Sequence, residues 1–268
     1  MLTKWILIVA TALMTGMGPS PAEDSGSLEF RIETDIFVNG QEQPVSENLT
    51  LFTEQKVYDF QMAKNSDTPV EVVIYDFSNK SFVLLDPSRK FKYEIDPEEL
   101  KYFVNSLRQD ESMKSKMPFM FDPQLDEQYD SESGWLSLAS SRLEYRCKGK
   151  SPSDHDAAMK HYYEFIDQYA KLNVTDPHKL PPFARLELNK SIVSRKWMPT
   201  TVEMNLDLSN ENGSRKINAK SKHYVIWKLS KKDASRIDSA KKMLNEFESV
   251  GLEKYRKLQS GDTTPTKR

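Results

Sequence analysis

Two neighbouring segments of this sequence are apolar on both of the faces that a β-strand presents. In residues 70–77, valine and isoleucine fill one face while Val73, Tyr75 and Phe77 fill the other. Residues 81–86 repeat this pattern. A strand that is apolar on both sides has to be buried on both sides. We therefore expect the centre of the sheet to be covered on each face by helices, by another sheet layer or by a ligand.

Further strands are predicted on both sides of this central pair. In the first of them, Leu28, Phe30 and Ile32 alternate with charged residues, the pattern of a strand with one face in water. Asn39-Gly40 then supplies a hairpin turn. The predicted strands lie around residues 28–38, 49–53, 57–62, 70–77, 81–86, 91–95, 198–208 and 224–229, the last two joined by an Asn212-Gly213 turn. Most of the sheet is therefore expected to be an antiparallel meander.

Four segments have the spacing of amphipathic helices that could cover the sheet. Asp96 followed by Pro97 is a strong start signal, because it places a capping side chain before a proline at the first helical position. The predicted helices run from Pro97 to about 107, from Ser153 to 172, from 181 to 193 and from 231 to about 258, with Gly251 as a weak point in the last. The predicted fold class is α+β, with a curved, mostly antiparallel sheet packed against several helices.

The first 22 residues have the order of a secretory signal peptide. Lys4 gives a positive start, and the apolar run over residues 5–14 is too short for a membrane-spanning helix. Ser20 and Ala22 occupy the two positions that a signal peptidase reads, so cleavage is predicted after Ala22. We expect a protein exported to the periplasm or the extracellular space, with no transmembrane segment after the leader.

The composition of the remaining chain limits its partners. Without the leader the chain would carry 37 basic and 40 acidic residues, a balance that predicts no nucleic-acid partner. Its apolar content can close a core, and we expect one domain over residues 23–260 with a disordered tail at 261–268. The single cysteine, Cys147, excludes an internal disulfide and alternates with Leu143 and Tyr145 as a buried apolar side chain would.

The sequence contains no strong catalytic or metal-binding motif. His161 and Glu164 have the spacing of a helical ligand pair, but two residues make a weak site. A Gly-x-Ser-x-Gly nucleophile motif and a phosphate-binding glycine loop are both absent from the sequence. We therefore predict no cofactor, no metal ion and no enzymatic activity.

One long irregular segment, residues 109–134, contains a group of methionine and phenylalanine side chains among charges and prolines. Methionine-rich stretches adapt to apolar partners, and long loops in compact domains are often functional. Two interpretations remain open. These side chains plug the edge of the core, or they form the gate of an apolar ligand site; the residues are Met113, Met117, Phe119, Met120 and Phe121.

Two stretches of the sequence resemble exported bacterial proteins. The strand Phe82-Val83-Leu84-Leu85-Asp86-Pro87, followed by another strand and a helix, is similar to the LolA-type fold of lipid and lipoprotein carriers. This resemblance covers about residues 28–107 and departs from the carriers in lacking an amphipathic helix before the first strand. It implies a LolA-like open barrel that holds helices and an apolar cavity. The segment from Pro181 to Asn189 also resembles stretches in uncharacterised exported proteins.

The strands that are apolar on both faces and the methionine-rich segment together predict an exported soluble binding protein. Such a protein would shelter a lipid or another apolar ligand, such as an acyl chain, on a curved sheet. The alternative is a non-enzymatic cell-envelope module with a solid core, which would serve a structural role or bind other proteins. A hydrolase is a third hypothesis, and it requires His161 to meet carboxylates that are remote in the sequence.

Overall fold

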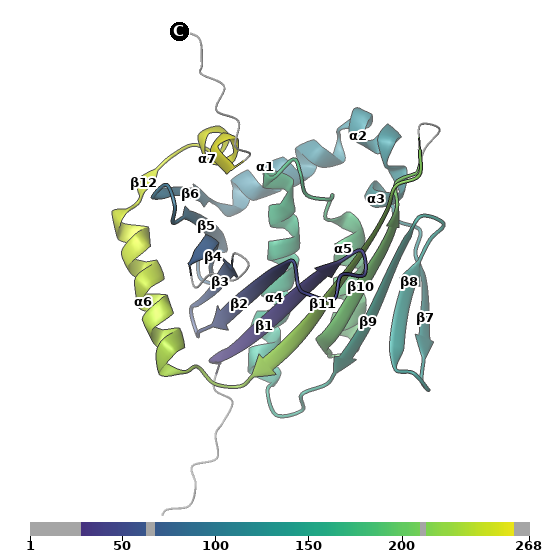
Figure 1. Cartoon of the computed structure of the whole chain (residues 1–268), viewed down its shortest axis with the longest axis horizontal. Coiled ribbons are helices and arrows are strands. Elements are labelled where there is room, and N and C mark those ends of the chain that lie inside the picture. Colours follow the sequence, from purple (N-terminus) through teal and green to yellow (C-terminus); the bar gives the residue numbers. More distant parts are fainter. Residues whose placement is uncertain (1–27, 63–67, 210–212, 260–268) are drawn as a thin grey trace, which may run out of the picture.

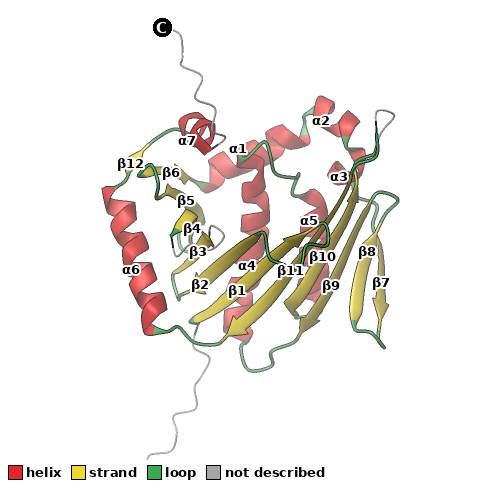
Figure 2. Cartoon of the chain, in the orientation of Figure 1, coloured by secondary structure: helices red, strands yellow, loops and turns green. Residues whose placement is uncertain are grey.

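The computed structural model describes residues 28–62, 68–209 and 213–259. The predicted signal peptide over residues 1–22, the predicted tail over 261–268 and Asn212 of the predicted turn lie outside these described residues. Within them, the chain forms one large, mostly antiparallel sheet packed with helices, which confirms the α+β class (Figures 1 and 2).

The sheet of the described residues has twelve strands and is built from two consecutive meanders. Strands β1 to β6 follow one another in chain order, and β7 to β11 do the same. The two meanders join where β1 pairs with β11, and the short β12 pairs in parallel with β6 at one edge. The strands are β1 (Phe30–Val38), β2 (Ser46–Phe52), β3 (Lys56–Met62), β4 (Pro69–Asp76), β5 (Ser81–Asp86), β6 (Phe91–Ile95), β7 (Asp126–Asp130), β8 (Trp135–Ala139), β9 (Leu143–Lys150), β10 (Met198–Asp207), β11 (Lys216–Ile226) and β12 (Glu248–Ser249).

Helices cover both sides of this sheet. Figure 1 shows α4 and α5 lying across one face, which we call the inner face, and α6 lying apart from them along the strands of the first meander. The helices are α1 (Pro97–Arg108), α2 (Glu111–Lys116), α3 (Pro118–Phe121), α4 (Asp156–Leu172), α5 (Phe183–Ser194), α6 (Lys231–Glu246) and α7 (Leu252–Gln259), with a 3-10 turn over Asn173–Thr175.

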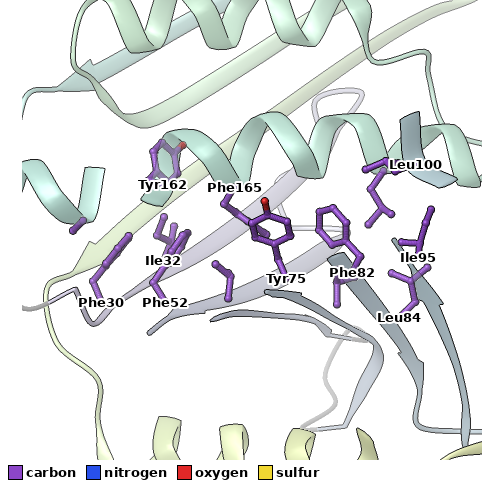
Figure 3. Packing of buried hydrophobic residues seen from close by; sticks show 14 of the residues in the cluster. Phe30, Ile32, Phe52, Tyr75, Phe82, Leu84, Ile95, Leu100, Tyr162 and Phe165 are labelled. Atoms are coloured by element: carbon purple, nitrogen blue, oxygen red, sulfur yellow. The ribbon is translucent and has the colours of Figure 1, made fainter. Parts of the chain in front are cut away.

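The expectation that the central strands are buried on both faces is confirmed, and helices do the covering. On the inner face, Tyr75 and Phe82 pack with Phe165 of α4 (Figure 3). On the opposite, outer face, other side chains of β2 to β5 pack with Ile237 and Ala240 of α6. Each large apolar side chain that is fully buried contributes about 1.5–3 kcal/mol, so the contacts with α6 add to the stability that the inner helices provide.

Aromatic rings set the spacing between the sheet and α4 on the inner face. Phe30 of β1 stacks on Phe52 of β2 with ring centroids 4.2 Å apart. Phe165 of α4 meets Phe52 edge-on at 5.4 Å. Both geometries are ones that aromatic pairs prefer. The helix is thereby held above β1 and β2 at a defined distance.

The second meander is buried on its inner face only. Leu143, Tyr145 and Cys147 of β9 are buried against α3 and α5, as the alternation in the sequence predicts. The intervening Arg146 points to the outer face, where its guanidinium lies 3.4 Å from a carboxylate oxygen of Glu203 on β10. This half of the sheet therefore has one apolar and one polar face.

The prediction of one irregular segment over residues 109–134 is wrong. This stretch contains α2, α3 and β7. Asp110 caps α2 by accepting a hydrogen bond of 3.0 Å from the Met113 N–H, and Pro118 occupies the first position of α3. The separate elements are too short to show helical or strand periodicity in the sequence.

The last predicted helix is interrupted between Glu246 and Leu252, and this break includes Gly251, the predicted weak point. Helix α6 ends at Phe247, whose backbone is extended and whose side chain is buried in the α6 cluster. The Glu248 N–H then donates to the Lys90 carbonyl at 3.0 Å, and the Val250 N–H donates to the Lys92 carbonyl at 2.9 Å. Pairing with the edge of the sheet replaces the helical hydrogen bonds here.

Two further boundaries differ from the prediction. Strand β11 begins at Lys216, well before the predicted residue 224, because much of its outer face is exposed and carries lysines that give no apolar alternation. Helix α4 begins at Asp156, and His155 precedes it without a side-chain capping bond, so Ser153 does not act as the predicted start.

Replacement of Asp233 by alanine tests the attachment of α6. Asp233 is buried, accepts hydrogen bonds from the Ser230 N–H at 2.8 Å and the Ser230 hydroxyl at 2.7 Å, and lies 3.1 Å from the Arg31 guanidinium of β1. Loss of this cap and ion pair is expected to lower the free energy of unfolding by about 2–4 kcal/mol in urea denaturation. Asp238→Ala on the same helix, which removes an exposed ion pair with Lys241, should change it by less than about 1 kcal/mol.

The same pair of variants has an expected pH dependence. Burial opposes ionisation of Asp233, but the hydrogen bonds from Ser230 and the charge of Arg31 outweigh it and lower the pKa of the carboxyl below its ordinary value of 3.8. A carboxyl group whose pKa is lowered by folding stabilises the fold at pH values above its ordinary pKa. This stabilisation is lost as the pH falls below the ordinary pKa and through the lowered one. The wild type should therefore approach Asp233→Ala in stability only in strong acid. A stability gap that closes already near neutral pH would contradict this assignment.

Candidate functional site

A row of polar side chains crosses the inner face of the sheet where apolar residues would be expected. Thr34 of β1 lies opposite His223 of β11 and opposite Asn48 of β2. Asn48 lies opposite Gln61 of β3, which lies opposite Glu71 of β4. Directly opposed residues share one face of a sheet, so these five side chains form a continuous polar row under the helices.

A buried carboxylate lies beside this row. Asp59 of β3 is 3% exposed and accepts hydrogen bonds of 2.7 Å from the Thr50 hydroxyl and 2.7 Å from the Tyr169 hydroxyl of α4. The Tyr169 oxygen in turn accepts a hydrogen bond of 3.2 Å from the Gln61 amide. Burial raises the pKa of Asp59, and the nearby charge of Glu71 adds to this effect. Both carboxylate oxygens of Asp59 are thus engaged within the protein.

At one end the polar row is closed by opposite charge. The carboxylate of Glu71 accepts a hydrogen bond of 3.0 Å from the Tyr255 hydroxyl of α7 and lies 3.4 Å from the Arg256 guanidinium. Arg256 also donates to the Thr175 hydroxyl at 2.8 Å. These contacts attach α7 to the sheet, and the function of Glu71 is structural in this arrangement.

At the other end the row borders a cavity of about 280 Å³ between the sheet and helices α4 and α5. Figure 3 shows four of its apolar wall residues, Ile32, Phe52, Tyr162 and Phe165. Ile36, Ile166 and Ala170 complete the apolar part of the wall, and the polar part comprises Thr34, Asn48, Thr50, Asp59, Tyr169, Asn173, Arg185, Ser221 and His223. Small-molecule sites usually combine apolar walls with convergent polar groups, and this cavity has both, with nine of its sixteen wall residues polar.

His223 holds the polar wall together in an uncharged form. One ring nitrogen lies 3.0 Å from the Thr34 hydroxyl, and the other lies 2.9 Å from the Ser221 hydroxyl. Burial lowers the pKa of His223 to about 4, and the positive charge of Arg185 contributes in the same direction. The imidazole is therefore neutral at physiological pH, with one nitrogen donating and the other accepting.

Arg185 is the one cationic side chain among the described residues that line the cavity. Its Nε–H donates to the Asn189 side-chain oxygen at 3.0 Å, one helical turn further along α5. Asn189 is itself fully buried and donates to the Asp167 carboxylate of α4 at 2.9 Å. The position of Arg185 at the cavity is thus fixed by contacts between the two helices.

The methionine-rich residues predicted as a ligand gate lie elsewhere. Met120 is fully buried, and Met117, Phe119 and Phe121 pack around it against β8 to β11 and α5, while Met113 lies half-buried in α2. These residues are absent from the wall of the cavity, although Phe119 borders a separate, mostly polar hollow of about 730 Å³. Their role as a gate stays a prediction, and their packing agrees with the alternative that they close the edge of the core.

The other reactive side chains considered in the sequence are engaged in packing. Burial raises the pKa of Cys147 to about 12, so its thiol stays protonated and unreactive. His161 stacks on Phe77 with ring centroids 4.2 Å apart, while Glu164 accepts a hydrogen bond of 2.9 Å from the Tyr75 hydroxyl. The described residues contain no group of three or more side chains arranged to bind a metal ion.

Sequence reasoning missed the polar row and Arg185. The sequence did contain one signal, which is a polar residue two positions after an apolar one and therefore on the same face of the strand. Examples are Thr34 after Ile32 and Asp59 after Val57. Such positions identify a polar inner face, but they do not show which strands lie together or where α5 places its arginine.

Comparison of the sequence with protein-family models and with curated proteins found no match to either. In the part of the chain that the structure describes, every helix is too short or too polar to cross a membrane. The function therefore has to be inferred from the geometry of the cavity.

Titration of His223 tests the description of the polar wall. Its ring resonances in NMR spectra, assigned with His223→Gln, should show no protonation until the pH approaches 4. Because the folded-state pKa lies below the ordinary value of 6.5, the unfolded state binds more protons between these two pH values. The wild type should therefore lose about 1–2 kcal/mol relative to His223→Gln between pH 7 and pH 5. A ring that titrates near pH 6.5 would contradict the description.

Proposed function

We propose that the protein is an exported, non-enzymatic binding protein that holds a small apolar ligand or a short acyl chain in the cavity between the sheet and helices α4 and α5. The observation that carries this proposal is the cavity of about 280 Å³ with walls formed by Ile32, Phe52 and Phe165. This volume lies just below the usual range for ligand pockets, which are about 300–1,000 Å³, and therefore suits a small ligand.

Helices occupy most of the inner face, and this limits the size of the ligand. Tyr162 and Phe165 of α4 pack directly on the sheet within the largest apolar cluster. The remaining space suits one short chain or a single small molecule, whereas a lipid with several long chains would require α4 to move. The order of residues 1–22 supports export to the periplasm or the extracellular space.

The LolA-type relationship belongs to the same proposal. The resemblance over residues 28–107 implies an open barrel that holds helices and an apolar cavity, and an open, mostly antiparallel sheet with a cavity under α4 and α5 supports it, although α6 covers the opposite face as well. We propose a shared architecture on this ground, with the bacterial envelope as the site of action.

A substitution that fills the cavity tests the proposal. Ala170 is a buried residue of α4 that lines the cavity, and Ala170→Leu should occupy the space of a ligand. The neutral fluorophore aminoanthracene should bind the wild type and bind Ala170→Leu at least about tenfold more weakly, as measured by fluorescence titration.

Ala157→Leu provides the matched control, because Ala157 lies on the same helix but is exposed. It should bind the fluorophore as the wild type does, and both variants should keep the circular dichroism spectrum of the wild type. Absence of binding to the wild type, or equal binding to Ala170→Leu, would argue for the alternative of an envelope module with a solid core.

One contact favours a second function, hydrolysis of a bound ester. The Ser221 hydroxyl lies 2.9 Å from a ring nitrogen of His223 at the cavity, which is the separation of a nucleophile and its base. However, the other nitrogen of His223 meets the Thr34 hydroxyl where a catalytic triad has a carboxylate. With a pKa of about 4, the imidazole is a weak base at neutral pH.

Ester hydrolysis can be measured directly. We expect the wild type and Ser221→Ala to hydrolyse p-nitrophenyl butyrate at the same rate as buffer alone. A rate above the buffer rate that disappears in Ser221→Ala would establish the hydrolase and overturn the assignment of a non-enzymatic protein.

A further inference from the structure

The guanidinium of Arg185 has spare hydrogen-bonding capacity at the cavity. An arginine carries five N–H donors, and the contact with Asn189 uses only the one on Nε. Within the described residues, the two terminal nitrogens of Arg185 form neither a hydrogen bond nor an ion pair. These two nitrogens are also accessible to solvent, because neither is a fully buried atom without a hydrogen-bond partner.

Two carboxyl groups of this region, Asp59 and Asp167, form no ion pair with Arg185. Asp59, which lines the same cavity, is engaged by Thr50 and Tyr169. Asp167 accepts the hydrogen bond of Asn189 and lies beyond ion-pair distance of Arg185. Arg185 therefore differs from Arg256 at the other end of the polar row, which is paired with Glu71.

The positive charge of Arg185 acts on several titratable groups around the cavity, although burial is the larger cause of each pKa shift. The charge contributes to lowering the pKa of His223 and opposes the burial that raises the pKa of Tyr162 and Cys147. Within the described residues Arg185 forms no ion pair, and its terminal nitrogens are accessible to solvent. An anion that entered the cavity would accept charge-assisted hydrogen bonds from these nitrogens, and a guanidinium fits carboxylate and phosphate groups with two parallel bonds.

We infer that the ligand of this cavity is an amphiphile with a compact anionic head group, carboxylate or phosphate, which binds to Arg185 while its apolar tail lies against Ile32, Phe52 and Phe165. This inference rests on the proposed binding function and names the chemical class of the ligand. The neutral His223 adds no charge to the wall, and Asp59 of the same wall has a raised pKa and both of its oxygens engaged by Thr50 and Tyr169.

Three ligands of ten carbon atoms each separate the contribution of the head group from that of the tail. Decanoate and decyl phosphate carry the two anionic head groups, and decanol carries a neutral one. Isothermal titration calorimetry of the intact protein should show decanoate or decyl phosphate binding at least about tenfold more tightly than decanol. Whichever of the two anions binds more tightly identifies the head group.

Substitution of Arg185 should remove this preference. Arg185→Met is expected to weaken binding of the anions by at least about tenfold and to leave decanol within about threefold of its wild-type affinity. Arg185→Lys should keep part of the preference, because it retains the charge but loses the bidentate geometry. Lys190→Met, which removes an exposed cation from the same helix, should bind all three ligands as the wild type does.

The outcomes separate the inference from the proposed function. If decanol binds the wild type as tightly as the anions do, the anionic head group is wrong and the apolar binding function stands. If Lys190→Met reduces anion binding as much as Arg185→Met, the effect is one of overall charge and the assignment to Arg185 is wrong. If neither these ligands nor aminoanthracene bind the wild type, the binding function itself is wrong. The comparison of ligands on the wild type holds even if Arg185→Met fails to fold.

Discussion

The burial of β2 to β5 on both faces is the constraint on which the rest of the structure depends. These strands carry apolar side chains on each side, and the chain covers them with α4 on the inner face and α6 on the outer face. Helix α6 is attached to the sheet by an ion pair as well as by apolar contacts, because Asp233 at the start of α6 lies against Arg31 of β1. Once both faces are covered, the centre of the sheet offers no surface for a large ligand.

The polar row explains why a cavity remains at all. Helix α4 can pack closely where β1 and β2 present Phe30 and Phe52, but the adjacent row presents Thr34, Asn48 and His223, which need hydrogen-bonding partners. At the Glu71 end the partners come from α7. At the other end, Arg185 forms no ion pair within the described residues, and in this asymmetry we see the basis for the proposed ligand site.

Sequence reasoning predicted the strands between residues 28 and 95 and the helix that begins at Pro97, because local patterns determine them. Alternating side chains, the Asn39-Gly40 turn and the Asp96 cap all act within a few residues. The break after α6 was predicted only as a weak point at Gly251, since its start at Phe247 depends on Lys90 and Lys92 offering carbonyl groups at the sheet edge.

The candidate site was less accessible to prediction for the same reason. Arg185 of α5 and His223 of β11 are separated in the sequence by the whole of β10, and their common cavity exists only because β11 pairs with β1 beneath α5. The methionine-rich segment stood out in the sequence by its composition, whereas the cavity residues did not. Its buried residue Met120 nevertheless packs in the core. Composition identified flexible apolar side chains, whereas the cavity arises from long-range strand pairing.

A crystal structure of the protein grown with decanoate tests the central claim most directly. The account predicts electron density for the ligand between the sheet and helices α4 and α5, with its carboxylate within hydrogen-bonding distance of Arg185 and its chain against Phe52 and Phe165. Decanoate bound only on the outer face of the sheet, or a cavity closed by the surrounding side chains, would contradict it.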